Sequence, residues 1–188
     1  MTHSLLKLSR HLAHVSAGAL LLFATAPAQA VDGMAIVYGD GDGSDNVDMF
    51  RIAAQWDWDQ RWFDNGGWYL SGYWELDAGY WDGQGGLNDS LADIGFTPVF
   101  RFQSNASSGI QPYVEGGIGA HLLSESQINS KDMSTSFQFG DHIGAGLRFG
   151  NKLEWDLGYR YQHFSNAGIK KPNPGINFHQ IRLGYHFD

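Results

Sequence analysis

Apolar and polar residues alternate along most of the chain after residue 30, and this pattern is the strongest structural signal in the sequence. Between residues 68 and 80, for example, Trp68, Leu70 and Trp74 share one set of alternate positions, while Glu75 and Asp77 lie on the other. A period of two indicates β-strands whose two faces meet different surroundings. The pattern predicts eight strands, at about 34–40, 49–58, 68–80, 92–102, 114–122, 133–149, 152–164 and 176–187.

The two faces of these strands favour a membrane barrel over a soluble β-sandwich. One face carries chiefly Phe, Trp, Tyr, Leu and Ile, over strands close to the ~9–11 residues that a tilted strand needs to cross a membrane. The chain also ends in an alternating strand with a near-terminal aromatic residue, Phe187, which resembles the closing strand of bacterial outer-membrane proteins. The other face carries charges of both signs, which can pair inside a small barrel but would not fill a sandwich core: Arg51, Glu75, Asp77, Asp93, Arg101, Glu115, Arg148, Glu154, Asp156, Arg160 and Arg182.

The sequence therefore predicts an all-β fold, an eight-stranded antiparallel transmembrane β-barrel of the outer membrane. Side chains fill the interior of a barrel of this size, so a diffusion pore is not expected. Outer-membrane barrels have short periplasmic turns and longer external loops. We expect the odd-numbered connections, at about 41–46, 83–89, 124–132 and 165–175, to face outside. The second connection, about 60–67, is long for a periplasmic turn and fits this rule imperfectly.

The first 30 residues have the features of a secretory signal peptide. Lys7 and Arg10 supply a basic start, an apolar run follows at 15–24, and Ala28 and Ala30 provide a small-x-small cleavage signal. We expect residues 1–30 to be removed, leaving residues 31–188 as one barrel domain. The chain has no cysteine, which excludes disulfides and thiol chemistry. Its formal net charge of −8 argues against nucleic acid as a partner.

One candidate site lies at the outer end of the seventh predicted strand. His163 and Ser165 continue the row of apolar residues that faces lipid, and two residues along a strand span about 6.5–7 Å, within reach of a side-chain contact. A serine nucleophile needs a base to accept its proton, and histidine has a suitable pKa. The alternative is a polar pair tolerated at the membrane interface. Water-soluble substrates would not use a lipid-facing site, so the position favours a lipid substrate.

The residues around this pair resemble those of a known family, the outer-membrane lipid A 3-O-deacylases (PagL). The resemblance covers the chain after residue 30 and is most specific at residues 159–177, where His163-Phe164-Ser165-Asn166-Ala167-Gly168-Ile169-Lys170 is followed by Pro172-Asn173 and Gly175-Ile176. It implies a serine esterase that hydrolyses the ester-linked 3-hydroxyacyl chain at the 3-position of lipid A, in the outer leaflet. It also implies His163 as base and Ser165 as nucleophile. Asn166 matches a position important for activity in the family, and we expect it to contribute to an oxyanion hole.

The third member of the triad departs from the family. The type member has a glutamate where this chain has Asn177, on the outward row of the last strand. An asparagine carbonyl can orient a histidine but cannot stabilise the imidazolium by charge. Asp141, on the outward row of the sixth predicted strand, is the alternative orienting residue, since a lipid-facing carboxylate requires a partner. The sequence leaves both residues open.

Other features bear on ligands and partners. We expect Lys170 and Lys171 in the seventh connection to contact the phosphates of lipid A, with an ordinary solvated loop pair as the alternative. Residues 40–45 resemble the start of a calcium loop but lack its glycine and glutamate. We expect no metal and no cofactor, because zinc-binding histidine spacing and nucleotide-binding glycine motifs are absent from the sequence. The expected partners are lipopolysaccharide and outer-membrane lipids, and the sequence does not decide between a monomer and a homodimer.

Two other functions are alternatives to the lipid A esterase. A non-catalytic structural or adhesive barrel would give His163 and Ser165 no reason to share a lipid-facing row. An acyltransferase barrel of the palmitoyl-transferring kind would need a lumen wide enough for a lipid, and the charged interior argues against one. We therefore expect an outer-membrane lipid A 3-O-deacylase.

Overall fold

The computed structural model describes residues 30–43, 46–64, 66–84 and 89–187. The chain divides into two units, Met1–Ala30 and Val31–Asp188, and the account below concerns the second. The predicted signal peptide lies outside the described residues except for Ala30, and its cleavage stays a prediction. None of the described residues forms a helix long and apolar enough to span a membrane.

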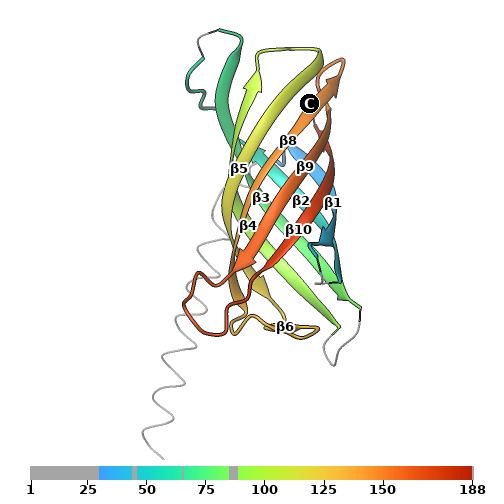
Figure 1. Cartoon of the computed structure of the whole chain (residues 1–188). Helices are drawn as coiled ribbons and strands as arrows, with labels where there is room; N and C mark the ends of the chain where they lie inside the picture. Colours follow the sequence, from blue (N-terminus) through green and yellow to red (C-terminus); the bar gives the residue numbers. More distant parts are fainter. Residues whose placement is uncertain (1–29, 44–45, 65, 85–88, 188) are drawn as a thin grey trace, which may run out of the picture. The chain divides into compact units, whose positions relative to one another are not determined.

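Eight long strands form a closed antiparallel barrel, in the spatial order β1-β10-β9-β8-β5-β4-β3-β2 (Figure 1). The first and last strands pair with each other, so the sheet has no free edge. This closure confirms the predicted eight-stranded barrel. The strands are β1 (Gly33–Gly41), β2 (Val47–Asp57), β3 (Trp68–Gly83), β4 (Ser90–Ser104), β5 (Gly109–Leu123), β8 (Phe137–Gly150), β9 (Trp155–Ser165) and β10 (Ile176–His186).

Three strand starts differ from the prediction by three residues or more. The strand expected from about residue 114 begins earlier, at Gly109, where it already pairs with Gly150 of β8. Two other strands begin later than predicted, because turn contacts hold the residues before them outside the barrel wall. The strand expected from residue 133 begins at Phe137, since the backbone N–H of Ser134 bonds to the Asp132 carboxylate in a tight turn. The strand expected from residue 152 begins at Trp155, after a turn in which Leu153 has a φ of +59°. The connection before β8 also contains a small hairpin of β6 (Gln127–Ile128) and β7 (Lys131–Asp132).

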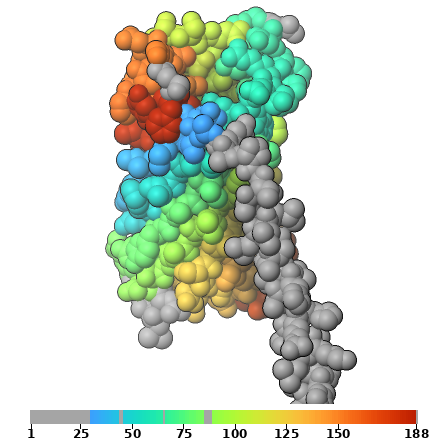
Figure 2. All heavy atoms as spheres, turned by 180° about the vertical axis from the view of Figure 1, so that it is seen from behind, coloured from blue at the N-terminus to red at the C-terminus, as the bar shows by residue number. Residues whose placement is uncertain are grey.

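The alternation of the sequence becomes an apolar outer wall and a charged interior. Outward side chains such as Ile118 and Ile143 are 66% and 70% exposed. Seen from behind, the side chains of successive strands form diagonal bands over the wall (Figure 2). The buried charges pair across the barrel, as expected: Arg160 contacts Glu75 and Glu115 at 2.7 Å each, Arg101 contacts Glu115 and Asp156 at 2.8 and 2.9 Å, and Arg51 contacts Asp77 and Asp93 at 3.0 and 2.8 Å.

One of the predicted interior charges lies elsewhere. Glu154 belongs to the turn before β9, where its carboxylate accepts a hydrogen bond from the backbone N–H of Lys152. Arg148 is half-buried on the inward row of β8, as predicted, and its Nε donates to the carbonyl of Leu153. Alternation alone assigned Glu154 to the inner face, but β9 begins one residue later.

An apolar cluster fills the barrel beneath the connections that carry β6 and β7. Trp81 is fully buried and meets Phe164 and Phe178 with ring centroids 4.8 Å apart in each case. Phe164 lies between the candidate residues His163 and Ser165, and Phe178 follows Asn177. Because successive side chains of a strand point to opposite faces, burying these two rings directs their neighbours outward. The cluster comprises Val47, Met49, Trp81, Leu91, Leu123, Ile128, Met133, Phe164, Ile176 and Phe178.

Candidate active site

The candidate site forms on the outer wall where β8, β9 and β10 lie side by side. In the register of the sheet, His163 on β9 is opposite Asn177 on β10 and also opposite Asp141 on β8. Ser165, the last residue of β9, is opposite Phe139. His163, Ser165 and Asn177 are each partly exposed, so the predicted outward row is present.

Of the two candidate orienting residues, Asn177 is the one that contacts the histidine. The Nδ1 atom of His163 lies 2.6 Å from Oδ1 of Asn177. Asp141 is equally near in register, but its side chain is exposed and makes no hydrogen bond or ion pair with His163 within the described part of the chain. An amide oxygen only accepts, so this contact favours the tautomer in which Nδ1 carries the proton and Nε2 is free to act as a base.

Asn166 is fully buried and holds the loop that follows Ser165. Its Nδ2 donates to the carbonyls of Met133 and Lys170 at 3.0 and 2.9 Å, and its own backbone N–H donates to Oδ1 of Asn173 at 3.0 Å. Both amide hydrogens are therefore committed to carbonyls in two different connections. This geometry indicates that Asn166 stabilises the loop next to Ser165. It leaves Asn166 no side-chain amide hydrogen to donate to an oxyanion.

Gly175 contacts the catalytic candidate and was not singled out from the sequence. It has a φ of +67°, and a Cβ placed on it would lie 2.6 Å from Cε1 and 3.2 Å from Nε2 of His163. The carbonyl of Gly175 accepts a hydrogen bond of 2.9 Å from Nζ of Lys131, at the start of β7. Gly175 belongs to the segment that resembles the family, so the sequence offered a signal for it. The lysine comes from a distant connection, and no local pattern indicates its contact.

The connection of residues 124–136 braces the loop of residues 166–175 at several points. Besides Lys131 and Met133, Ser134 takes part, because its Oγ donates to the carbonyl of Pro172 at 2.7 Å. The bracing leaves Lys170 and Lys171 exposed on the loop, as the proposed phosphate contact requires. Among the described residues, Ser165 and His163 do not hydrogen-bond to each other. Such catalytic bonds are often long before a substrate binds.

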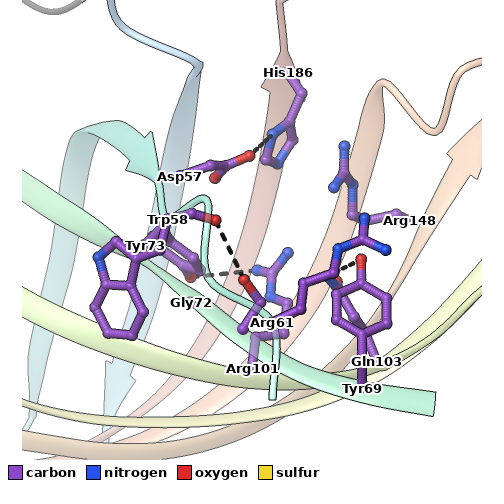
Figure 3. A pocket seen from close by; sticks show the side chains of 11 residues that line it. Asp57, Trp58, Arg61, Tyr69, Gly72, Tyr73, Arg101, Gln103, Arg148 and His186 are labelled. Atoms are coloured by element: carbon purple, nitrogen blue, oxygen red, sulfur yellow. Dashed lines mark hydrogen bonds and ion pairs between the residues drawn. The ribbon is translucent and has the colours of Figure 1, made fainter. Parts of the chain in front are cut away.

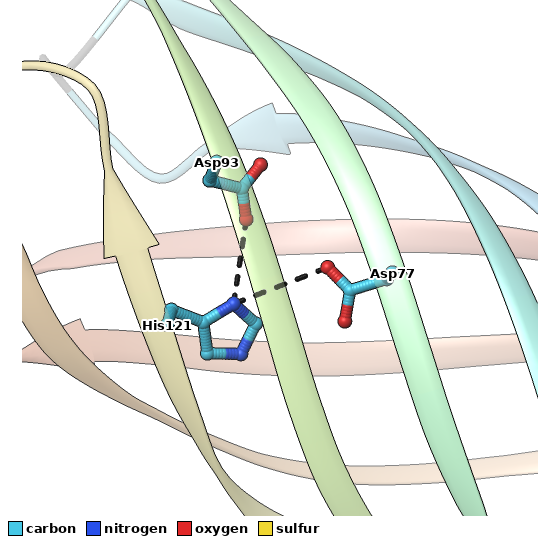
Figure 4. Close-up of side chains that lie close together, drawn as sticks. All are labelled: Asp77, Asp93 and His121. Carbon is cyan, nitrogen blue, oxygen red and sulfur yellow. Dashed lines mark hydrogen bonds and ion pairs between the residues drawn. The ribbon is translucent and has the colours of Figure 1, made fainter. Parts of the chain in front are cut away.

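Two other groups of polar side chains lie in the barrel, away from the candidate site. Asp77, Asp93 and His121 lie close together in the interior, with His121 Nδ1 3.3 Å from an Asp93 oxygen (Figure 4). Arg51 contacts both carboxylates, so the cluster is compensated by a protein cation. At the end of the barrel opposite Ser165, Arg61, Arg148 and other polar residues line a cavity of about 150 Å³ (Figure 3). Neither group contacts His163.

Comparison with known proteins identifies the family. The lipid A 3-O-deacylase (PagL) family model matches residues 48–186. The lipid A deacylase PagL of Pseudomonas aeruginosa is 36% identical over 156 residues, covering 83% of this chain and 86% of that protein. The chain belongs to the lipid A 3-O-deacylase family. The resemblance inferred from residues 159–177 is thereby confirmed.

Two further relatives of this PagL-family chain agree over nearly its whole barrel. The lipid A deacylase PagL of Bordetella bronchiseptica is 37% identical over 171 residues, covering 89% of this chain and 90% of that protein. A crystal structure of the outer membrane enzyme PagL has 32% sequence identity and a TM-score of 0.74, and the match covers 82% of this chain and 99% of the other. The barrel therefore agrees with the PagL family in sequence and in structure.

Proposed function

We propose that this chain hydrolyses the ester at the 3-position of lipid A, in the outer leaflet of the outer membrane, with Ser165 as nucleophile and His163 as general base. The observation that carries the mechanism is the contact of 2.6 Å between His163 Nδ1 and Asn177 Oδ1, next to a serine on the same outward row. A histidine held in this way keeps Nε2 available for the serine hydroxyl.

The reaction follows from these positions. Nε2 of His163 removes the proton from Oγ of Ser165, and Oγ attacks the ester carbonyl carbon of the acyl chain. The tetrahedral intermediate collapses, the sugar oxygen leaves with the proton held on Nε2, and the acyl chain stays on Oγ. A water molecule, deprotonated by the same Nε2, then attacks the acyl-enzyme. The proton returns to Oγ, and the fatty acid is released.

Asn177 gives this mechanism a neutral orienting residue. Its carbonyl oxygen holds the imidazole ring but supplies no full negative charge to the imidazolium that forms during the reaction. The site faces outward beside apolar side chains, where a neutral partner avoids placing an additional carboxylate next to lipid. We propose Asn177, rather than Asp141, as the third residue.

The loop beyond Ser165 supplies the cations for substrate docking. Lys170 and Lys171 are exposed and follow the turn that Asn166 holds. Cations beside a layer of anionic headgroups are favoured, so we propose that these two lysines contact the phosphates of lipid A. The ion pairs among the described interior residues argue against a lipid-sized lumen of the kind that a palmitoyl-transferring barrel would need.

The test is to express Ser165→Ala and His163→Ala variants in a host outer membrane and to measure lipid A by mass spectrometry. The unchanged protein should remove one hydroxyacyl chain, and both variants should remove none. Ser90→Ala, an outward serine at the start of β4, is the matched control and should retain activity. Heat-dependent migration on gels checks that each barrel folds. Activity in a folded Ser165→Ala variant would refute the serine mechanism. If expression of the wild-type protein left lipid A unmodified, that result would favour the non-catalytic barrel.

A further inference from the structure

A group of polar side chains lies on the outer wall next to the candidate site and has no part in the mechanism above. The outer polar cluster consists of Asp42, Tyr159, Tyr161 and His179. Tyr159 Oη lies 2.6 Å from His179 Nδ1, and Tyr161 Oη donates to the Asp42 carboxylate at 3.2 Å. His179 Nε2 is 3.9 Å from the other carboxylate oxygen of Asp42. The four side chains therefore form one connected group drawn from β9, β10 and the residue that directly follows β1.

This cluster is unusual for its place in the barrel. Its histidine and carboxylate side chains are 49% and 47% exposed, although the outward rows around them continue with Ile143, Ile181 and Leu183. A charged group on the lipid-facing side of a membrane protein is unfavourable unless a polar partner meets it. The contacts within the cluster leave about half of Asp42 and His179 uncovered, so these side chains can still accept or donate hydrogen bonds.

The cluster is continuous with the candidate catalytic residues. Tyr161 precedes His163 by two residues on β9, so both side chains point outward. His179 follows Asn177 by two residues on β10 and points outward in the same way. The backbone N–H of Asp42 donates to the carbonyl of Asn177 at 2.9 Å. With a rise of about 3.3 Å per residue and about 4.8 Å between strands, Asp42, Tyr161 and His179 lie within about 15 Å of Ser165 along the wall, and Tyr159 lies about 20 Å away. The two-sugar backbone of a lipid A molecule whose ester lies at Ser165 would extend over the nearer three.

The charge of the cluster indicates which part of the substrate it would meet. Asp40 is the register partner of His179 on β1, and Asp48 accepts a hydrogen bond from Tyr38 on the neighbouring outward positions. This acidic surface would repel a phosphate. Carboxylate, phenol and imidazole side chains instead suit neutral groups that donate and accept hydrogen bonds, such as sugar hydroxyls and amides.

We propose that the outer polar cluster is a subsite for the neutral amino-sugar part of lipid A, next to the ester that is cleaved. The inference rests on the proposed function, because it assigns the cluster to the same substrate. The two parts of the substrate then contact surfaces of different charge. Lys170 and Lys171 contact the phosphates. The sugar forms hydrogen bonds with Asp42, Tyr161 and His179. The competing interpretation is an aromatic belt that only anchors the barrel at the membrane interface.

The experiment compares two substrates in the same detergent micelles, lipid A and a p-nitrophenyl acyl ester that has no sugar. Asp42→Asn and Tyr161→Phe keep the shape of each side chain and remove one hydrogen-bonding function. Loss of one such bond should lower the ratio of kcat/KM for lipid A to kcat/KM for the simple ester by about fivefold to tenfold. Tyr185→Phe, another outward tyrosine on β10, is the matched control and should leave the ratio unchanged.

Three outcomes would overturn the subsite. An unchanged ratio in both cluster variants would mean that the sugar does not contact these groups. An equal fall for both substrates would assign the cluster to anchoring or to barrel structure. A loss in Asp42→Asn that disappears when a chelator is added would indicate a bridging cation in place of direct hydrogen bonds. Failure of the proposed function is distinct from all three, because the unchanged protein would then hydrolyse neither substrate.

Discussion

A methyl group at Gly175 should disable the histidine without changing any catalytic side chain. The added Cβ would lie 2.6 Å from Cε1 of His163, whereas ordinary van der Waals contact begins at 3.4 Å. The ring would have to move by about 0.8 Å, against a hydrogen bond of 2.6 Å that holds it to Asn177. A misplacement of about 1 Å in an active site can lower the rate about 100-fold. We therefore expect Gly175→Ala to reduce kcat/KM for lipid A by about that factor.

The control for this variant separates the contact with the histidine from the strain of the backbone. Gly168 lies in the same loop and also has a positive φ, +79°, but a Cβ there meets nothing within 4 Å. Both alanine variants should lose about 1–2 kcal/mol of stability from the left-handed conformation, and only Gly175→Ala should lose most of its activity. The assay is release of the hydroxyacyl chain by protein whose folding has been checked by gel migration. Equal activities of the two variants would refute the argument.

Three further predictions follow from the same structure. Asn177→Ala should lower kcat and Asn177→Glu should preserve or raise it, while Asp141→Asn has little effect. If Asp141→Asn instead lowered kcat in the deacylation assay and Asn177→Ala had little effect, Asp141 would be the orienting residue. Replacing Lys170 and Lys171 together with Gln should raise KM for lipid A more than it lowers kcat, and unchanged kinetics would leave them as a solvated pair. Glu115→Gln should destabilise the barrel by about 3–5 kcal/mol, because its two arginine partners stay buried; an unchanged urea midpoint would contradict this.

The period of two allowed the wall of the barrel to be predicted from the sequence, because each residue's face depends only on its position along a strand. His163, Ser165 and Asn177 were placed on the outer wall in this way. The choice between Asn177 and Asp141 could not be made, since both are register partners of His163. The direction in which each side chain leans decides the contact, and alternation carries no information about that.

The connections were harder to predict, because their contacts join segments far apart in the sequence. The hairpin of β6 and β7 was missed, and with it the contact of Lys131 with the loop of the candidate site. Asn166 was expected to contribute to an oxyanion hole, yet it follows Ser165 on the opposite face and its side-chain amide donates to two carbonyls. The alternation of β9 continues one residue past its end at Ser165, and it would have predicted that the Asn166 side chain points inward.

The pairing of β1 with β10 has a consequence for the timing of activity during biogenesis. The proposed nucleophile, base and orienting residue lie on the last two barrel strands, and the carbonyl of Asn177 accepts a hydrogen bond from the backbone N–H of Asp42, which directly follows the first strand. The site is therefore complete only after the two ends of the chain have met. An unassembled chain crossing the periplasm would lack the arranged histidine and the sugar contacts. Esterase activity would begin once the protein is inserted beside its lipid, which protects other esters of the cell envelope while it travels.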